Sequence, residues 1–313
     1  ARHNADTVVA RPTGCEFSHC TGRINCKCNF HMLSEHLCWL VERVRTMGNA
    51  KFTVLTHGGA GSSEKHSDGT EKAAHTCYNA GQKEASLVHA VCLSVGALED
   101  DGRFNAGAGA HARENGKIQH DAAVADGAGR FGAVAALEGF KNPVYVAEAV
   151  SETEYRVLAG SGAAEFASLR NFEKVNRKQM SGRGGQDFST SSSTDTVGCA
   201  AFDGTTFVVG LSTGGKAGVQ YGRVGDVPIL GSGLYAGPEG AVAATGDGEA
   251  IIMNMTAFRT YQLIEKGMAP DKIVEEVLGW FPESDAFGII LVTQKGHAGG
   301  SNRSMAWSAR EFC

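Results

Sequence analysis

Asp195 and Thr196 stand where the character of the sequence changes abruptly. Residues 178–195 are rich in serine, glycine and charge, which is typical of a flexible linker, whereas the apolar runs 197–202 and 206–211 are typical of a buried hairpin. A threonine hydroxyl is a weak nucleophile until a base takes its proton. A free α-amino group, with a pKa of about 7.7–8.0, can be that base, and cleavage before Thr196 would create one. The alternative is a β-branched residue that only begins a strand.

A second pair, Arg223 and Asp226, has the charges that the two main-chain groups of a free amino acid require. A guanidinium group can bind a carboxylate through two parallel hydrogen bonds. A carboxylate can in turn bind an ammonium group. The same spacing is also common in surface ion pairs, which contribute little to stability. On the residues alone, the pair is therefore either a substrate clamp or a surface salt bridge.

Glycine is unusually abundant, with 42 of 313 residues, or about 13% against a usual ~7%. Many of these glycines form short clusters that lie close to apolar segments typical of strands. The clusters occupy residues 57–61, 106–109, 213–215 and 231–233. Tight turns are one explanation. The other is backbone that lies close to a ligand, which glycine permits without steric cost.

Taken in order, these motifs resemble the plant-type asparaginases, isoaspartyl peptidases and glycosylasparaginases, which are N-terminal nucleophile hydrolases. The central motif, Asp195-Thr196-Val197-Gly198, is similar to the site at which members of this family cut themselves. The other matching motifs are His57-Gly58-Gly59-Ala60-Gly61, Phe104-Asn105-Ala106-Gly107, residues 121–127, Ser212-Thr213-Gly214-Gly215, Gly222-Arg223-Val224-Gly225-Asp226, Gly231-Ser232-Gly233 and Ala244-Thr245-Gly246-Asp247-Gly248-Glu249. The resemblance covers residues 52–313, and the ordered set is far more specific than any one glycine cluster.

The resemblance implies a chain that activates itself. The Thr196 hydroxyl would attack the carbonyl carbon of Asp195, the acyl group would move from nitrogen to oxygen, and water would hydrolyse the resulting ester. The same hydroxyl would then act as the catalytic nucleophile. The cut would give an α subunit, residues 47–195, and a β subunit, residues 196–313, which together form one domain.

The resemblance also assigns the groups around the nucleophile. Thr213 would hydrogen-bond the nucleophile, although the residue alone is equally typical of a turn at the end of a strand. Asn105 would help to position the nucleophile. Thr245 and the backbone N–H of Gly246 would contact the substrate and form the oxyanion hole, in which each donor contributes about 10²–10³ in rate.

The activity that the resemblance implies is hydrolysis of L-asparagine and of β-aspartyl (isoaspartyl) dipeptides through a β-aspartyl ester of Thr196, with release of L-aspartate. Arg223 would bind the substrate's α-carboxylate and Asp226 its α-ammonium group. No organic cofactor is expected. In some members of the family a structural sodium ion is bound by the equivalent of residues 98–108. Here its ligands would be the backbone carbonyls of Leu98, Glu99, Asp101, Phe104, Ala106 and Ala108.

Two other functions stay open. A glycosylasparaginase would cleave the bond between a sugar and asparagine, and an uncleaved, inactive relative would act as a binding or scaffold protein. Residues 213–215 are closer to the asparaginase branch, and Thr194 stands where many glycosylasparaginases have histidine. Val227 and Lys216 depart from the common family pattern, which leaves the preference among substrates open.

The fold that the resemblance implies is an α+β, four-layer αββα sandwich of the N-terminal nucleophile hydrolase type, assembled as a homodimer of αβ pairs. The periodicity of the chain also favours a mixed α/β class. We expect strands at residues 52–56, 118–124, 131–137, 197–202, 206–211 and 288–292. We expect helices at residues 88–100, 144–150, 163–169, from about 249, and at 273–281.

The N-terminal segment has a different composition from the rest of the chain. Five cysteines fall within residues 15–38, but their spacings do not match the paired Cys-x2-Cys pattern of structural zinc sites. Met47, just before the predicted strand at 52–56, looks like a natural start. We therefore expect residues 1–46 to be a cysteine-rich extension outside the fold. The remaining cysteines are scattered, as is typical of reduced thiols.

Composition argues against two classes of partner. The chain has 42% hydrophobic residues, enough for a sizeable core, and a net charge of -5, which gives no basic surface for nucleic acid. No run of about 18 apolar residues is present. The first thirty residues also lack the apolar core of an export signal. We therefore expect a cytoplasmic enzyme that does not span a membrane and does not bind nucleic acid.

Overall fold

The computed structural model describes residues 52–83, 86–175 and 196–312, all within the compact unit Asn49–Cys313. The expected N-terminal extension, residues 1–46, and the expected linker, residues 178–195, lie outside the described residues. The described chain is a mixture of helices and strands, as the sequence predicts. Its strands form two sheets.

The larger sheet has seven strands in the order β11-β1-β5-β6-β2-β3-β4. Neighbouring strands are antiparallel except for β3 and β4, which are parallel. In chain order the strands are β1 (Phe52–His57), β2 (His120–Asp126), β3 (Phe131–Leu137), β4 (Val157–Ala159), β5 (Val197–Phe202), β6 (Phe207–Thr213) and β11 (Trp307–Phe312). Strand β5, which begins directly after Thr196, therefore lies inside the sheet and pairs on both sides.

The smaller sheet has four antiparallel strands in the order β10-β9-β8-β7. The strands are β7 (Leu234–Gly237), β8 (Gly240–Gly246), β9 (Phe287–Thr293) and β10 (Gly296–Ser301). Strand β8 is central and ends in Thr245 and Gly246, two of the predicted site residues.

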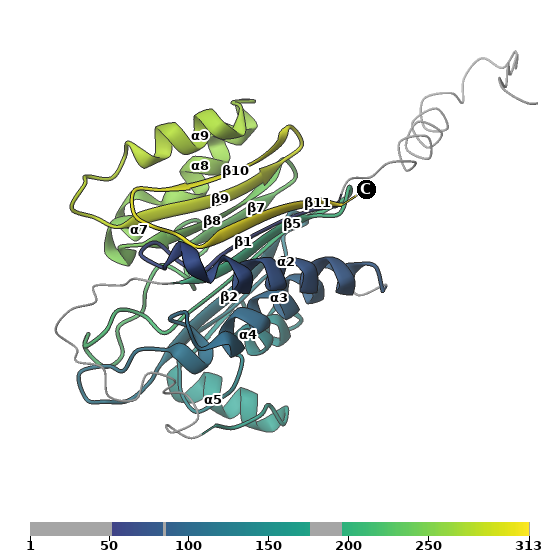
Figure 1. Ribbon diagram of the computed structural model, residues 1–313. Helices are drawn as coiled ribbons and strands as arrows, with labels where there is room; N and C mark the ends of the chain where they lie inside the picture. The colour runs from purple at the N-terminus through teal and green to yellow at the C-terminus, as the bar shows by residue number, and fades with distance from the viewer. Residues whose placement is uncertain (1–51, 84–85, 176–195, 313) are drawn as a thin grey trace, which may run out of the picture. The chain divides into compact units, whose positions relative to one another are not determined.

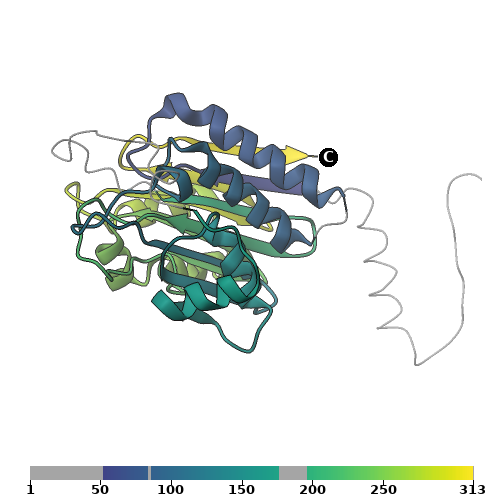
Figure 2. The ribbon, with the colours of Figure 1, turned by 90° about the horizontal axis from the view of Figure 1, so that it is seen from below.

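Helices cover the outer faces of both sheets, as Figure 1 shows and as Figure 2, seen from below, confirms for the blue and teal helices on the larger sheet. The larger sheet carries α2 (Ser67–Gly81), α3 (Leu87–Asp101), α4 (Pro143–Ser151) and α5 (Gly160–Leu169). The smaller sheet carries α7 (Gly248–Asn254), α8 (Thr256–Glu265) and α9 (Pro270–Leu278). Two short 3-10 helices, η2 (Glu64–His66) and η3 (Gly107–Gly109), lie in the connections.

Alternation along each strand decides which core a side chain joins. In β5, Val197 and Cys199 pack on the side of α2, α3 and α4, whereas Ala200 lies in the core between the two sheets. In β9, Ile290 faces that same central core, while Ile289 packs on the side of α7–α9. Alternate side chains of these strands therefore join different hydrophobic cores, one of which is shared by the two sheets.

Most predicted elements are present, with boundaries that shift by one or two residues at most ends. The predicted strands correspond to β1, β2, β3, β5, β6 and β9, and the predicted helices to α3, α4, α5, α7 and α9. The sequence pattern does not predict α2, β4, β7, β8, β10 or β11. The buried face of α2 consists of small residues such as Ala73, Ala74 and Cys77, and the helix contains no Val, Leu, Ile, Met or Phe that would mark an apolar stripe. Strand β8 consists mainly of glycine and alanine, so it lacks the run of large apolar residues that marks a strand such as β9.

Within the described part of the chain, no helix is both long and apolar enough to cross a membrane. The same residues contain no group of three or more His, Cys, Asp or Glu that could hold a metal ion. The cysteines predicted as a separate cluster, residues 15–38, lie outside the described ranges. Cys77, Cys92 and Cys199 are buried free thiols, which agrees with the expectation of reduced cysteines.

Candidate active site

Strand pairing brings Thr196 and Thr213 together. Strands β5 and β6 are antiparallel with Val197 opposite Ser212, so the next residues outward, Thr196 and Thr213, face each other at the end of the ladder. Both are buried, with 4% of each residue exposed. The predicted cleavage residue Asp195 lies outside the described residues.

These two threonines line a small pocket with the predicted substrate-binding residues. The lining residues are Thr196, Thr213, Gly215, Lys216, Arg223, Asp226, Gly246, Asp247 and Gly248. They come from both sheets and from the loop between β6 and β7. The remaining cavity has a volume of about 10 Å³, which is the order of size that one water molecule needs. The structure thus brings together five of the predicted site residues without leaving a large empty space.

Asn105 acts on the turn that follows Thr213. Its Nδ2 donates to the carbonyl oxygen of Gly215 at 2.6 Å, and its backbone carbonyl accepts from Gly214 N at 2.9 Å. Gly215 N in turn donates to Thr213 Oγ1 at 3.0 Å. Asn105 therefore fixes the turn that holds the Thr213 hydroxyl, next to Thr196 in the pocket.

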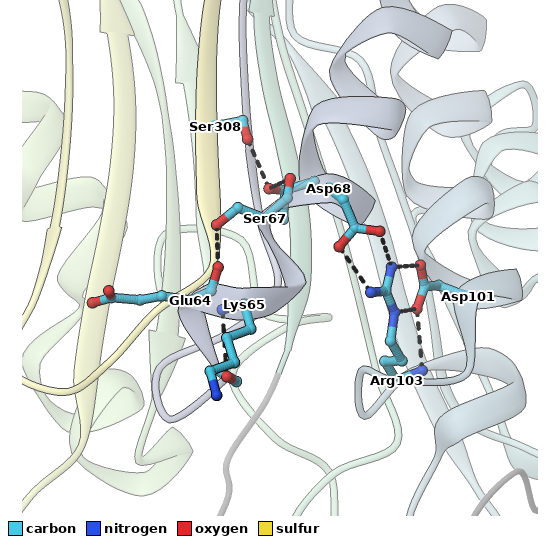
Figure 3. A network of polar contacts seen from close by, with 9 residues as sticks. Glu64, Lys65, Ser67, Asp68, Asp101, Arg103 and Ser308 are labelled. Atoms are coloured by element: carbon cyan, nitrogen blue, oxygen red, sulfur yellow. Dashed lines mark hydrogen bonds and ion pairs between the residues drawn. The ribbon is translucent and has the colours of Figure 1, made fainter.

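An ionic network lies just before Asn105 in the chain, and Figure 3 shows it. The Arg103 guanidinium donates to both carboxylate oxygens of Asp68 at 2.8 and 3.0 Å and to both of Asp101 at 2.6 and 2.7 Å. This arrangement joins the start of α2 to the end of α3. The contact with Arg103 also holds the pKa of the Asp68 carboxyl below its usual range.

The predicted oxyanion-hole residues lie at the end of β8. Thr245 is fully buried, and its Oγ1 accepts a hydrogen bond from Ala60 N at 3.2 Å, which connects it to the glycine-rich loop after β1. Gly246 has a φ of +138°, and a Cβ at this position would overlap the carbonyl oxygen of Ala286. A glycine is therefore required at position 246 for both conformation and space.

Arg223 is held by a residue to which the sequence assigned no role. Its Nε and Nη2 donate to the two carboxylate oxygens of Glu249, both at 2.9 Å. Glu249 follows the oxyanion-hole residues and lies in α7. The hydrogen bonds from Arg223 lower the pKa of Glu249, which therefore stays ionised. The motif from Ala244 to Glu249 contains this carboxylate, but its partner becomes visible only in the fold.

Asp226 is a buried carboxylate that can accept a further hydrogen bond. It is 4% exposed, and its Oδ2 has no hydrogen-bond partner among the described residues. Burial raises its pKa to about 7, against the opposing effects of its own backbone N–H and of Arg223. A Cβ on Gly248 would lie 2.6 Å from Arg223 Nη2 and 2.9 Å from Asp226 Oδ1. Arg223 and Asp226 therefore flank Gly248, and they can bind the two ends of one small ligand.

The sequence did not assign a role to Asp121, which positions this pair. Its Oδ2 accepts from Gly225 N at 2.9 Å and its Oδ1 from Ala136 N at 2.8 Å. These bonds tie the loop that carries Arg223 and Asp226 to strand β2. Burial raises the pKa of the Asp121 carboxyl, although both backbone N–H groups oppose the effect. A carboxylate inside the predicted strand 118–124 was the available signal in the sequence.

Two further buried basic side chains, those of Arg113 and His57, lie close to the site. A Cβ on Gly215 would overlap the Arg113 guanidinium, whose Nε and Nη1 lack partners among the described residues; burial lowers its pKa. A Cβ on Gly198 would overlap the His57 ring. Burial lowers the pKa of His57 to about 3, against a weaker effect of the Thr196 backbone. His57 is therefore a neutral ring packed beside the start of β5.

Comparison with known proteins identifies a family to which the chain is similar. Residues 50–311 match the model of a family described as asparaginase. The chain is 34% identical over 280 residues to a plant-type L-asparaginase of Thermococcus kodakarensis, with 79% of this chain and 91% of that protein covered. It is 34% identical over 283 residues to an isoaspartyl peptidase/L-asparaginase of Homo sapiens (82% and 92%) and 32% identical over 289 residues to one of Rattus norvegicus (83% and 86%).

Proposed function

Because the chain belongs to the asparaginase family, we propose that it is an isoaspartyl peptidase and L-asparaginase. It hydrolyses the side-chain amide of L-asparagine and the isopeptide bond of β-aspartyl dipeptides, and it releases L-aspartate. One observation carries this assignment. A buried threonine, an arginine and an incompletely paired aspartate, namely Thr196, Arg223 and Asp226, line a single pocket.

Maturation precedes catalysis in this proposal. The Thr196 Oγ attacks the carbonyl carbon of Asp195, the C–N bond breaks, and the hydroxyl proton ends on the new amine. Water then hydrolyses the ester and releases the Asp195 carboxyl group. The Thr196 amine becomes the base for the next reaction, since its usual pKa of about 7.7–8.0 suits neutral pH.

Catalysis repeats the same chemistry on the substrate. Arg223 binds the α-carboxylate and Asp226 the α-ammonium group, so the side-chain carbonyl carbon lies against Thr196. Attack by the hydroxyl expels ammonia or the second amino acid and leaves a β-aspartyl ester, which water hydrolyses. Thr245 and Gly246 N–H stabilise the oxyanion, and pre-positioned donors of this kind are the largest single contribution in many hydrolases.

The finer features of the fold belong to the same proposal. The two stacked sheets with helices outside them support a four-layer αββα sandwich of the N-terminal nucleophile hydrolase type. We take the mature assembly to be a homodimer of αβ pairs. Gel filtration with light scattering of the cut protein tests this, because one αβ pair would elute at half the expected mass.

A structural sodium ion also belongs to this proposal. The end of α3 and helix η3 approach each other so closely that a Cβ on Gly107 would lie 2.6 Å from the Cβ of Glu99, and the last turn of a helix leaves carbonyls without intrahelical partners. Carbonyl oxygens are hard ligands that suit such a cation. The group that would hold it comprises the carbonyls of Leu98, Glu99, Asp101, Phe104, Ala106 and Ala108. Its contribution would be to fix the segment before Asn105.

The proposed function is tested on the full chain. Mass spectrometry after incubation should report a fragment that begins at Thr196, and the same sample should release aspartate from L-asparagine and from a β-aspartyl dipeptide. The variant Thr196→Ala lacks the hydroxyl for both steps. We therefore expect it to remain one polypeptide and to lose activity by at least about 10³-fold.

Three outcomes distinguish the rival functions. An intact chain that is fully active contradicts the mechanism, because no α-amine would exist. An intact, inactive wild-type chain indicates a binding or scaffold protein. A cut chain that hydrolyses only the bond between sugar and asparagine is a glycosylasparaginase.

A further inference from the structure

A lysine stands at the rim of the pocket beside the nucleophile. Lys216 lines the pocket together with Thr196 and Asp226. Its side chain is 48% exposed, whereas the other two residues are each 4% exposed. The lysine therefore marks the side on which the pocket meets solvent.

The loop that carries Lys216 is fixed on both sides of this residue. Before it, Gly215 N donates to Thr213 Oγ1 and the Gly215 carbonyl accepts from Asn105 Nδ2. After it, Gly218 N donates to the carbonyl oxygen of Ala112 at 3.0 Å. The backbone of Lys216 is thus held in place relative to the reacting groups, while its side chain extends toward solvent.

The ammonium group of Lys216 has a loose counterion. Lys216 Nζ lies 3.9 Å from Asp247 Oδ2, and Asp247 Oδ1 is engaged at the start of α7 by Ala250 N at 3.1 Å. By contrast, Arg223 makes two hydrogen bonds of 2.9 Å to Glu249. A long and partly exposed ion pair is weak, so an incoming anion can share or replace Asp247.

The geometry also decides which part of a substrate meets this lysine. The α-carboxylate and α-ammonium groups belong at Arg223 and buried Asp226, and the scissile carbonyl at Thr196. Thr196 and Asp226 are each 4% exposed and the Arg223 side chain is 16% exposed, whereas the Lys216 side chain is 48% exposed. Atoms beyond the scissile nitrogen therefore lie at the exposed rim, next to Lys216.

We propose that Lys216 selects substrates whose leaving group carries a carboxylate. This inference rests on the proposed function and refines it. A β-aspartyl dipeptide with a free C-terminus has such a carboxylate one carbon away from the scissile nitrogen. L-Asparagine releases ammonia and has none, and a dipeptide amide has the same shape without the charge. Lys216 binds the carboxylate as an ion pair and takes no part in bond breaking.

The first test uses the wild-type chain alone. We expect kcat/KM for β-aspartyl-leucine to exceed that for β-aspartyl-leucinamide by about 3- to 10-fold at low salt, the range of a partly exposed charged contact. Because salt screens such contacts, the ratio should fall as sodium chloride is raised. A ratio near one at low salt overturns the proposal, and so does a ratio that does not respond to salt.

The second test uses two substitutions and a matched control. Lys216→Met keeps the length of the side chain and removes its charge, so the ratio should fall toward one. Lys216→Arg keeps the charge and should keep most of the ratio. Lys272→Met removes one positive charge from the exposed surface of α9, where Lys272 pairs with Glu275, and should not change the ratio.

The controls separate this inference from the proposed function. If Lys216→Met lowers kcat/KM for L-asparagine as much as for β-aspartyl-leucine, the substitution has damaged the whole site. That result overturns the role of Lys216 in substrate selection. Should Lys216→Met fail to cut itself, the salt series and Lys216→Arg decide the question. A wild-type chain that hydrolyses none of these substrates overturns the proposed function instead.

Discussion

At the scale of single residues, the Asp226 carboxylate leaves one oxygen available to a ligand. Its carboxylate is buried, and Oδ2 has no partner among the described residues. Burying an ionised carboxylate is costly unless it is paired, and this is the reason that its pKa rises to about 7. The α-ammonium group of an amino-acid substrate would supply the missing partner.

This property predicts a pH effect on substrate choice. Below pH 7, Asp226 gains a proton and loses its attraction for an ammonium group, so L-asparagine should bind less well as the pH falls. Succinamate, which has the same amide but no α-ammonium group, should not share this loss. The measurement is the ratio of kcat/KM for the two substrates between pH 5 and 8. It should rise by up to about tenfold per pH unit and level off above pH 7.

The comparison cancels the titration of the Thr196 amine, which acts on both substrates. A ratio that stays constant across this pH range would show that Asp226 does not bind the α-ammonium group. Asp226→Asn serves as the control, because it should remove the pH dependence of the ratio together with most of the preference for L-asparagine.

At the scale of elements, the start of β5 depends on a close contact with β1. Gly198 pairs with His57, and a Cβ at position 198 would overlap both the His57 ring and Leu211. Interiors packed to this density do not accept an added methyl group without shifts. Gly198, two residues after Thr196, therefore sets the distance between β5 and its neighbours.

We expect Gly198→Ala to destabilise the protein by about 1–3 kcal/mol, the usual range for overpacking, and to slow self-cleavage. Gly162→Ala is a matched control in helix α5, where a Cβ meets nothing within 4 Å. It should stabilise by about 0.5–1 kcal/mol, because alanine favours a helix. Thermal unfolding of both variants decides the matter. Equal and small shifts would refute the contact argument.

At the scale of the whole molecule, the strand order interlocks the two sides of the proposed cut. Strand β1 precedes Thr196 in the chain but lies between β11 and β5, which both follow it. Strand β2 likewise pairs with β6. Three antiparallel ladders therefore join the proposed α and β subunits across the larger sheet, in addition to the core between the sheets.

We expect the cut protein to behave as one particle until it is denatured. Gel filtration in native buffer should give a single peak at the same volume as uncut Thr196→Ala, while a denaturing gel should resolve two fragments from the wild type only. Dissociation of the fragments in native buffer would contradict the importance of the shared ladders.

The sequence by itself determined the chemical groups and the elements that carry them. Thr196 at the boundary between a polar stretch and an apolar run, and Arg223 with Asp226 in one short loop, are local patterns that a linear reading detects. Strands such as β1 and β9 follow from continuous apolar runs, and a helix such as α3 follows from its apolar spacing. Elements built from small residues, such as α2 and β8, lack the large apolar side chains that mark the others.

Only the tertiary structure decided which groups meet. Glu249 holds Arg223, Asp121 fixes Gly225, and Asn105 reaches the turn after Thr213. Each of these contacts joins residues that are far apart in the chain, and no local spacing encodes them. Strand register and layer packing create them, because a buried polar group is stable mainly where the fold places a hydrogen-bond partner beside it. The residues of the site can therefore be found in the sequence, but only the packing of the two sheets brings them together.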